Sequence, residues 1–170
     1  MKFDLFKKII DEAKMYKLPA VNLNGLGEPI THPKLVDMIK YCKDSGIEDI
    51  MFHTNGTVMT EKFAKKLIES GLTQIIFSLD TTDKKTYEEM RIGANFEEVN
   101  ENVEKFIKVR NQMGSKLPIV KTVMVLTDKT VHHAPDFKKK WQEKSDSIAA
   151  QDLVYSFEDE ENYEKNVEDN

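Results

Sequence analysis

The chain of 170 residues has a single cysteine, Cys42, and no long run of apolar residues. One cysteine excludes a disulfide framework within the chain, and it excludes a metal cluster held only by cysteines of this chain. No stretch approaches the roughly 20 consecutive apolar residues that a membrane-spanning helix needs. The first ten residues, MKFDLFKKII, are too charged for a secretory signal peptide, so we expect a cytoplasmic protein with no membrane partner.

A concentrated basic patch is also missing, and we therefore expect no nucleic-acid partner. The three lysines at 138–140 are interpreted as a solvated helix face. The net charge is −5, and residues 158–170 alone hold seven acidic residues and one lysine, so the rest of the chain sums to +1. We expect two parts: a folded domain over residues 1–157, and an acidic linker or disordered tail over residues 158–170.

Strand-like and helix-like segments alternate along the folded part, which predicts a parallel sheet with right-handed crossovers. Short apolar runs predict strands at 20–24, 49–53, 74–79, 118–126 and 148–154. Apolar stripes at helical spacing lie between them: Phe3, Phe6, Ile10 and Ala13; Leu35, Met38, Ile39 and Cys42; Phe63, Leu67 and Ile68; Phe96, Val99, Val103 and Phe106; Phe137 and Trp141. Capping residues are expected at Pro33, Gly46, Thr60, Gly71, Asn95 and Gly114.

Polar residues gather where three predicted strands end. They follow the strands at Asn24 to Glu28, at His53 and Asn55, and at Ser78 and Asp80. A doubly wound sheet would bury both faces and favour continuous apolar runs. A barrel instead has an inner face whose carboxyl-terminal rim is the usual active site. We therefore favour a barrel or part-barrel. Five strands do not close a TIM barrel, and the chain begins with a predicted helix, so the first strand is expected to be missing.

The loop NLNGLGEP at residues 22–29 is the first candidate site. Gly25 and Gly27 lack a Cβ, so a ligand can approach the backbone closely. Glu28 supplies an anion, and Pro29 stiffens the chain that follows. This combination suits a ligand ammonium group. The alternative is a tight turn in which Glu28 only caps the next helix.

The stretch FSLDTTDKKTYEEMR supplies the second group of candidates. Ser78 and Asp80 are placed to bond sugar hydroxyls, and the guanidinium of Arg91 can fork onto a carboxylate. The alternative is that Asp80 caps a helix and Arg91 lies in solvent. His53 is either a ligand contact or a satisfied histidine at the rim. The adjacent His132 and His133 diverge, so no metal site is expected there.

Three motifs, NGLGEPITHPKL, HTNGTVMT and IIFSLDTTDKKTYEEMR, occur in this order with one in each strand–helix unit. Together they resemble the core of a radical S-adenosylmethionine (radical SAM) enzyme, and FKKKWQEKSDSIAAQD resembles members followed by a SPASM-type domain. The resemblance implies an α/β fold, a partial (β/α)6 TIM-like barrel lacking its first strand, over residues 1–157. It implies S-adenosylmethionine (SAM) as the ligand and a peptide or protein as a possible substrate.

The resemblance also implies roles for individual residues. Gly27 and Glu28, in the loop with Gly25 and Pro29, would hold the methionine amino group of SAM. Ser78 would contact the ribose, and Arg91 would bind the methionine carboxylate. Other residues would line the cavity: Asn55, Asp80 and the strand from Thr122 to Leu126.

One part of the family pattern is absent. The family holds a [4Fe–4S] cluster on a Cys-x3-Cys-x2-Cys loop, and that cluster cleaves SAM to a 5′-deoxyadenosyl radical with electrons from a donor such as flavodoxin or ferredoxin. This chain has no such loop. It is therefore interpreted as a fragment of a radical SAM enzyme that is inactive alone. Two alternatives stay open: a degenerate, non-catalytic barrel that binds SAM or another ligand, and an unrelated enzyme in which Glu28, His53 and Asp80 perform acid–base catalysis.

Overall fold

The structure, a computed structural model, describes residues 1–152 and shows one parallel sheet with its strands in the order β1-β2-β3-β4-β5. The strands are β1 (Ala20–Asn22), β2 (Asp49–Thr54), β3 (Gln74–Ser78), β4 (Ile119–Leu126) and β5 (Ser147–Asp152). The helices are α1 (Phe3–Met15), α2 (Leu35–Asp44), α3 (Glu61–Glu69), α4 (Lys84–Met90), α5 (Phe96–Gln112) and α6 (Ala134–Trp141), with short 3-10 turns η1 (Pro29–Thr31) and η2 (Val131–His133). The predicted acidic tail lies outside the described residues.

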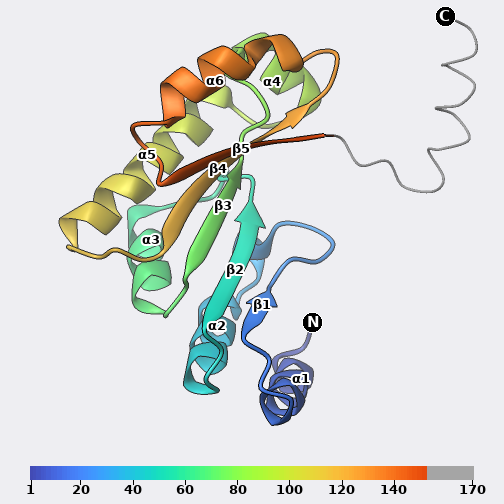
Figure 1. The fold of residues 1–170 in the computed structure, drawn as a ribbon, viewed down its shortest axis with the longest axis vertical. Helices are drawn as coiled ribbons and strands as arrows, with labels where there is room; N and C mark the ends of the chain where they lie inside the picture. Colours follow the sequence, from blue (N-terminus) through green and yellow to red (C-terminus); the bar gives the residue numbers. More distant parts are fainter. Residues whose placement is uncertain (153–170) are drawn as a thin grey trace, which may run out of the picture.

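Every predicted strand and helix in the described part is confirmed in type, and the helices pack on one side of the sheet. Figure 1 shows α3 and α5 lying along the same face. The hydrophobic core lies between the helices and the sheet. The strands contribute the side chains of one face to it, including Ile50 and Phe52 of β2 and Ile75 and Phe77 of β3. Ile76 and Val123 are also buried but stand outside that core, since alternate side chains point to the other face. Helices on one face of the sheet agree with the predicted part-barrel, in which the helices lie outside and the other face is the inner one.

Most of the predicted caps are confirmed. Thr60 accepts a hydrogen bond from the backbone N–H of Phe63, and Asn95 accepts one from Glu98. Gly46, Gly71 and Gly114 follow helices with positive φ, as helix-ending glycines do. The prediction for Pro33 is wrong, because α2 begins two residues later. The ring nitrogen Nδ1 of His32 accepts the backbone N–H of Lys34, and the carbonyl of His32 accepts that of Leu35. Pro33 therefore lies in a turn that precedes the helix.

The lysine run at 138–140 is less uniform than predicted. Lys138 and Lys139 are exposed, but Lys140 is half-buried and donates to the side-chain oxygen of Asn100 at 2.6 Å. Its ammonium group stands 4.9 Å from the centre of the Phe96 ring. Burial lowers the pKa of Lys140. The interpretation as a solvated face is therefore wrong for Lys140, which joins α6 to α5.

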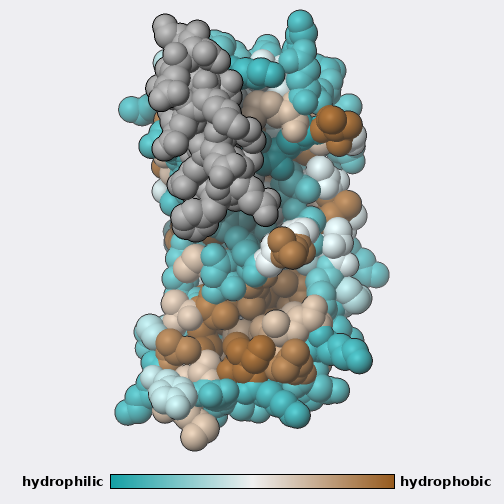
Figure 2. Space-filling model, turned by 90° about the vertical axis from the view of Figure 1, so that its right-hand side faces the viewer, coloured by the Kyte–Doolittle hydropathy of each residue, from teal (hydrophilic) through white to brown (hydrophobic). Residues whose placement is uncertain are grey.

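The apolar surface of the described residues is uneven. Figure 2 shows brown, hydrophobic side chains gathered over the lower half of the face that carries α1 and β1 in Figure 1. Large apolar side chains exposed in this part of the chain include Leu5, Ile9, Leu18 and Leu26. β1 is an edge strand, paired only with β2. Among the described residues, no helix is long and apolar enough to cross a membrane.

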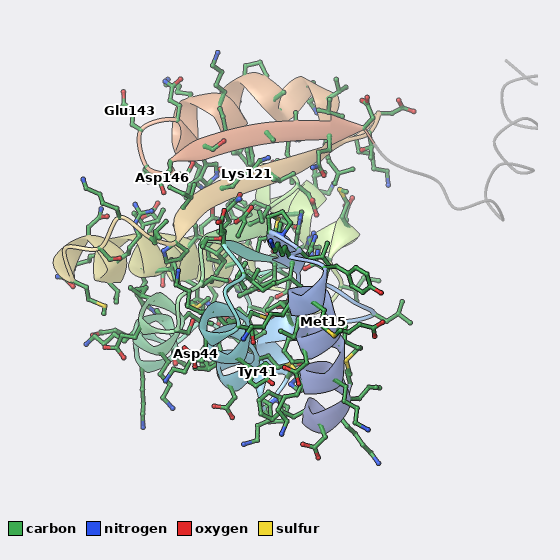
Figure 3. All side chains as sticks on the ribbon, turned by 60° about the horizontal axis from the view of Figure 1, so that its bottom comes forward. Met15, Tyr41, Asp44, Lys121, Glu143 and Asp146 are labelled. Atoms are coloured by element: carbon green, nitrogen blue, oxygen red, sulfur yellow. The ribbon has the colours of Figure 1, made fainter. Side chains whose placement is uncertain are left out.

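An ion pair between a buried arginine and a partly exposed aspartate ties α5 to the far edge of the sheet. Arg110 of α5 is 6% exposed, and its guanidinium donates to Asp146 and, at 2.9 Å, to the carbonyl of Pro118. Asp146 precedes β5 (Figure 3) and also accepts the backbone N–H of Val120 at 2.7 Å. Removing the Asp146 carboxylate leaves the buried charge of Arg110 without its partner, which is destabilising.

The pH dependence of folding should report this pair. Burial raises the pKa of the Asp146 carboxyl, but hydrogen bonds from Arg110 and from the backbone of Val120 outweigh it, so the pKa is lowered. A lowered pKa stabilises the fold above the unfolded pKa of about 3.9, and the gain is lost as the pH falls through the folded value. Urea unfolding should therefore show that wild type exceeds Asp146→Asn in stability by more at pH about 5 than at pH about 3. An equal difference at both pH values, or the same trend in the exposed control Asp128→Asn, would contradict this account.

Candidate functional site

A cleft of about 350 Å³ lies at the carboxyl edge of β1, β2 and β3. Parallel strands end at one edge of a sheet, so three loops that are distant in sequence meet there. The lining residues are Asn24, Gly25, Gly27, Glu28, Pro29, His53, Thr54, Asn55, Ser78 and Arg91. Seven of the eight predicted binding residues are among them. Asp80 is not, and neither is the strand from Thr122 to Leu126.

The glycine loop after β1 forms one wall of this cleft. Gly27 has a φ of +98°, a conformation that favours glycine, and no atom lies within 4 Å of where a Cβ would stand. A ligand can therefore approach the backbone here. Leu26, between the two glycines, projects fully into solvent.

Glu28 connects two loops. One carboxylate oxygen accepts the backbone N–H of Ile30 at 3.1 Å and caps the turn η1, as the structural alternative predicted. The other oxygen accepts the backbone N–H of Asn55 at 2.8 Å, from the loop after β2. A carboxylate has about four lone-pair sites, so each oxygen keeps capacity for a further donor. Glu28 is thus both a cap and a fixed anion at the cleft.

Asn24 makes a second link between the same two strand ends. Its side-chain oxygen accepts the backbone N–H of His53 at 2.7 Å. Asn55 turns its own oxygen inward to Thr57, accepting from the backbone N–H at 3.0 Å and bonding the hydroxyl at 2.8 Å. The sequence analysis noted Asn24 among the polar residues at the strand ends but gave it no role in the site. Its only sequence signal was its position at a strand end.

His53 is a half-buried residue on the inner face of the sheet. Burial lowers the pKa of His53, and the positive charge of Lys121 lowers it further. Both residues pair in register with Ile76, from the strands on either side of it, and Figure 3 labels Lys121 on β4. Both effects favour the neutral imidazole. Within the described residues, no hydrogen bond joins the side chains of Glu28, His53 and Asp80, so the acid–base alternative gains no support.

Asp80 and Arg91 form a pair behind the cleft. Asp80 is 4% exposed, and its Oδ2 accepts Nε–H of Arg91 at 2.6 Å. The alternative in which Asp80 caps a helix is wrong, because Asp83 caps α4 by accepting the backbone N–H of Thr86 at 2.8 Å. The alternative of a solvent-exposed Arg91 is also wrong, since its side chain is 28% exposed and paired. Arg91 lines the cleft, and Asp80 supports it.

A contact that the sequence did not signal lies beside this pair. The buried Thr81 hydroxyl meets Nδ1 of His133 at 2.6 Å, and it also accepts the backbone N–H of Asp83. The two partners are 52 residues apart, and no local pattern links them. The described part of the chain contains no group of three or more His, Cys, Asp or Glu side chains arranged to hold a metal ion.

Cys42 is unsuited to cluster chemistry. It is fully buried in α2, as its helical spacing predicted, and burial raises the pKa of its thiol to about 11. A cluster ligand must be a thiolate, and Cys42 is the only cysteine of the chain. The residues present therefore do not fit a [4Fe–4S] cluster.

A second, apolar cavity of about 520 Å³ adjoins the other side of the glycine loop. Its walls come from α1, β1 and α2, through residues that include Phe6, Ile10, Val21 and Met38. Gly25, Gly27, Glu28 and Pro29 line both cavities. The sequence reasoning did not foresee this cavity, because the apolar positions of α1 and α2 were all assigned to a closed core.

The sequence is similar to a known protein family and to individual members of it. The sequence profile of the radical SAM superfamily matches residues 1–139. The tungsten-containing aldehyde ferredoxin oxidoreductase cofactor-modifying protein of Pyrococcus furiosus is 30% identical over 141 residues, which cover 82% of this chain and 39% of that protein. A probable GTP 3',8-cyclase of Methanococcus maripaludis is 36% identical over 109 residues, covering 64% of this chain and 36% of that one. The chain thus spans under two fifths of the length of these relatives.

Solved structures share the fold. Streptococcus suis SuiB bound to S-adenosylmethionine superposes with a TM-score of 0.72 at 19% identity, over 89% of this chain and 34% of that one. Methylornithine synthase gives a TM-score of 0.66 at 15% identity, over 91% of this chain and 44% of that one. The five parallel strands therefore correspond to part of a TIM-like barrel, as predicted.

The bridging role of Glu28 can be tested by removing one of its acceptor sites. In Glu28→Gln only one side-chain oxygen remains, so either the turn at Ile30 or the link to Asn55 loses its acceptor. A hydrogen bond donated to a charged acceptor contributes about 1.5–3 kcal/mol, and we expect a loss of about 1 kcal/mol because Glu28 is partly solvated. Urea unfolding measures the loss, and amide exchange at Asn55 and Ile30 should show which link opens. Unchanged exchange at both amides would contradict the bridge.

Proposed function

The chain belongs to the radical SAM superfamily, a family of enzymes that use SAM and a [4Fe–4S] cluster, and on that premise we propose that its cleft binds SAM. The observation that carries the proposal is that Glu28, Asn55 and the pair Ser78 and Arg91, which come from three strand–helix units, line one cleft. When bound beside a reduced cluster, SAM supplies the radical chemistry of the family. The residues described here bind and orient the ligand. They do not supply the cluster's ligands.

Glu28 and Gly27 are proposed to hold the methionine amino group. An ammonium group needs acceptors, and the Glu28 carboxylate keeps unfilled lone pairs toward the cleft after accepting two backbone N–H groups. Because both oxygens are already fixed by those bonds, little side-chain freedom is lost when the ligand binds. The missing Cβ at Gly27 leaves the room that the ligand needs.

Ser78 and Arg91 are proposed to hold the rest of the cofactor. Ser78 is the last residue of β3, so its hydroxyl is placed at the rim for a ribose hydroxyl. Arg91 brings to the same cleft a guanidinium whose terminal N–H groups have no hydrogen-bond partner among residues 1–152, and a carboxylate matches such a pair of donors. Gly25, Pro29 and Asn55 complete the lining.

The proposed reaction is modification of a substrate by the complete radical enzyme, with flavodoxin or ferredoxin as electron donor. A peptide or protein side chain is one candidate substrate, since SuiB, which shares the fold, was solved with its precursor peptide SuiA. A small cofactor precursor is the second candidate. It is supported by relatives that are more similar in sequence to this chain than SuiB is, a cofactor-modifying protein and GTP 3',8-cyclases. A non-catalytic SAM-binding module is the remaining reading, supported by the single buried cysteine.

Calorimetric titration of the iron-free chain with SAM tests the proposed site. We expect saturable binding, and about a tenfold weaker affinity for Glu28→Gln, because a tenfold change corresponds to about 1.4 kcal/mol and charged hydrogen bonds contribute that much or more. Ser78→Ala should weaken binding by several-fold. Glu61→Gln is the matched control, because Glu61 is an exposed carboxylate on α3 that pairs with Lys65. No heat of binding, or equal losses in Glu28→Gln and Glu61→Gln, would sink the proposal.

Anaerobic reconstitution with iron and sulfide tests the conclusion about the cluster. A chain with one buried cysteine should not retain stoichiometric iron after gel filtration. Cys42→Ala should behave like wild type, because the buried thiol takes no part. A brown protein carrying one cluster per chain would show that the reading of the donor set is wrong.

A further inference from the structure

The chain makes an unusual turn where β3 ends. Asp80 has a φ of +56°, which non-glycine residues rarely adopt. The backbone N–H of Thr81 donates to the carbonyl of Leu79 at 2.6 Å and closes a three-residue turn around Asp80. Turns of this hand are strained and persist where the surroundings hold them. In this turn the Asp80 side chain lies inside the protein, where the residue is 4% exposed.

The Asp80 side chain meets Arg91 there. Its Oδ2 accepts Nε–H of Arg91 at 2.6 Å, while its Oδ1 is buried without a hydrogen-bond partner in the described part of the chain. The backbone of Arg91 is fixed separately, because its N–H donates to the carbonyl of Tyr87 at the end of α4. Two parts of one strand–helix unit therefore hold the two ends of the arginine: α4 holds the backbone, and the turn after β3 holds Nε.

This arrangement decides which edge of the guanidinium is available. An arginine has five N–H donors, one on Nε and four on the two terminal nitrogens. Asp80 occupies Nε, so the side-on edge made by Nε and one terminal nitrogen is closed to a ligand. Among residues 1–152 the terminal nitrogens have no hydrogen-bond partner, and Arg91 lines the cleft. The free edge is the end-on pair.

We propose that Asp80 is a positioning residue that fixes Arg91 for end-on, two-point binding of the ligand's carboxylate. The inference rests on the proposed function and deepens it, since it assigns to one buried residue the preference for a ligand that keeps its α-carboxylate. Asp80 does not touch the ligand. It acts through Arg91, whose planar fork matches a carboxylate and which lysine cannot replace.

A merely structural ion pair would behave differently from a positioning pair. If Asp80 served stability alone, its removal would weaken every ligand of the cleft to the same degree. If it aims Arg91, its removal should weaken only ligands that carry the carboxylate. SAM and decarboxylated SAM differ in that one group, so their affinity ratio isolates the effect of Asp80.

Calorimetric titration of the 170-residue chain with both ligands makes the test. Wild type should prefer SAM over decarboxylated SAM by about tenfold or more, in the range of a charged bidentate contact. In Asp80→Gly the ratio should fall close to one, because glycine accepts the positive φ but removes the carboxylate. Asp80→Asn, which also tolerates this φ and keeps an acceptor, should recover part of the ratio. Arg91→Lys should lose it.

The outcomes separate this inference from the proposed function. Wild type that binds neither ligand contradicts the proposed function and removes the inference with it. Wild type that prefers SAM, with the same preference in Asp80→Gly, leaves the proposed function standing and overturns the inference. Equal weakening of both ligands in Asp80→Gly also overturns it.

A measurement without ligand guards against a variant that folds poorly. The Nε–H resonance of Arg91, assigned by its disappearance in Arg91→Lys, should exchange slowly with water in wild type. It should exchange rapidly in Asp80→Gly while the backbone amide spectrum stays dispersed. Rapid exchange already present in wild type would overturn the proposed anchoring.

Discussion

Parallel pairing of the strands is the constraint on which the rest of the structure depends. Each of the first three strands delivers its carboxyl end to one edge of the sheet, and each returns through a helix on the same face. The other face carries alternate side chains such as His53 and Ile76, and no helix layer of residues 1–152 covers it. Loops from three units must therefore meet at one rim. The cleft is a consequence of topology before it is a consequence of any single residue.

Carboxylates then fix what topology brings together. Glu28 joins the loop after β1 to the loop after β2 through the backbone of Asn55, and Asn24 repeats the link through His53. Asp80 joins the end of β3 to Arg91 at the end of α4. Each bond spans at least 11 residues of sequence. Charged or polar groups that are held in place before a ligand arrives lose little entropy on binding, and this supports a binding rim over a set of ordinary turns.

The sequence predicted the elements and most of the rim, because apolar periodicity and strand-end polarity are local signals. It placed Gly27, Glu28, Ser78 and Arg91 in one site, and the structure brings them around one cleft. Its errors are non-local. Pro33 lies in a turn held by His32 and not at the start of α2, and Lys140 packs over the ring of Phe96 and does not lie in solvent. The Asp80–Arg91 pair and the Thr81–His133 contact depend on three-dimensional neighbours that no spacing reveals.

The chain belongs to the radical SAM superfamily, and we propose that its own residues hold SAM, whereas its single buried cysteine does not fit a cluster. The central claim is that the rim after β1, β2 and β3 is a single SAM site. Amide chemical-shift mapping of the iron-free chain with SAM tests it most directly. The account predicts shifts concentrated at Gly27, Asn55, Ser78 and Arg91, which belong to three separate units. Shifts confined to the apolar cavity beside α1, or no shifts at saturating SAM, would contradict it.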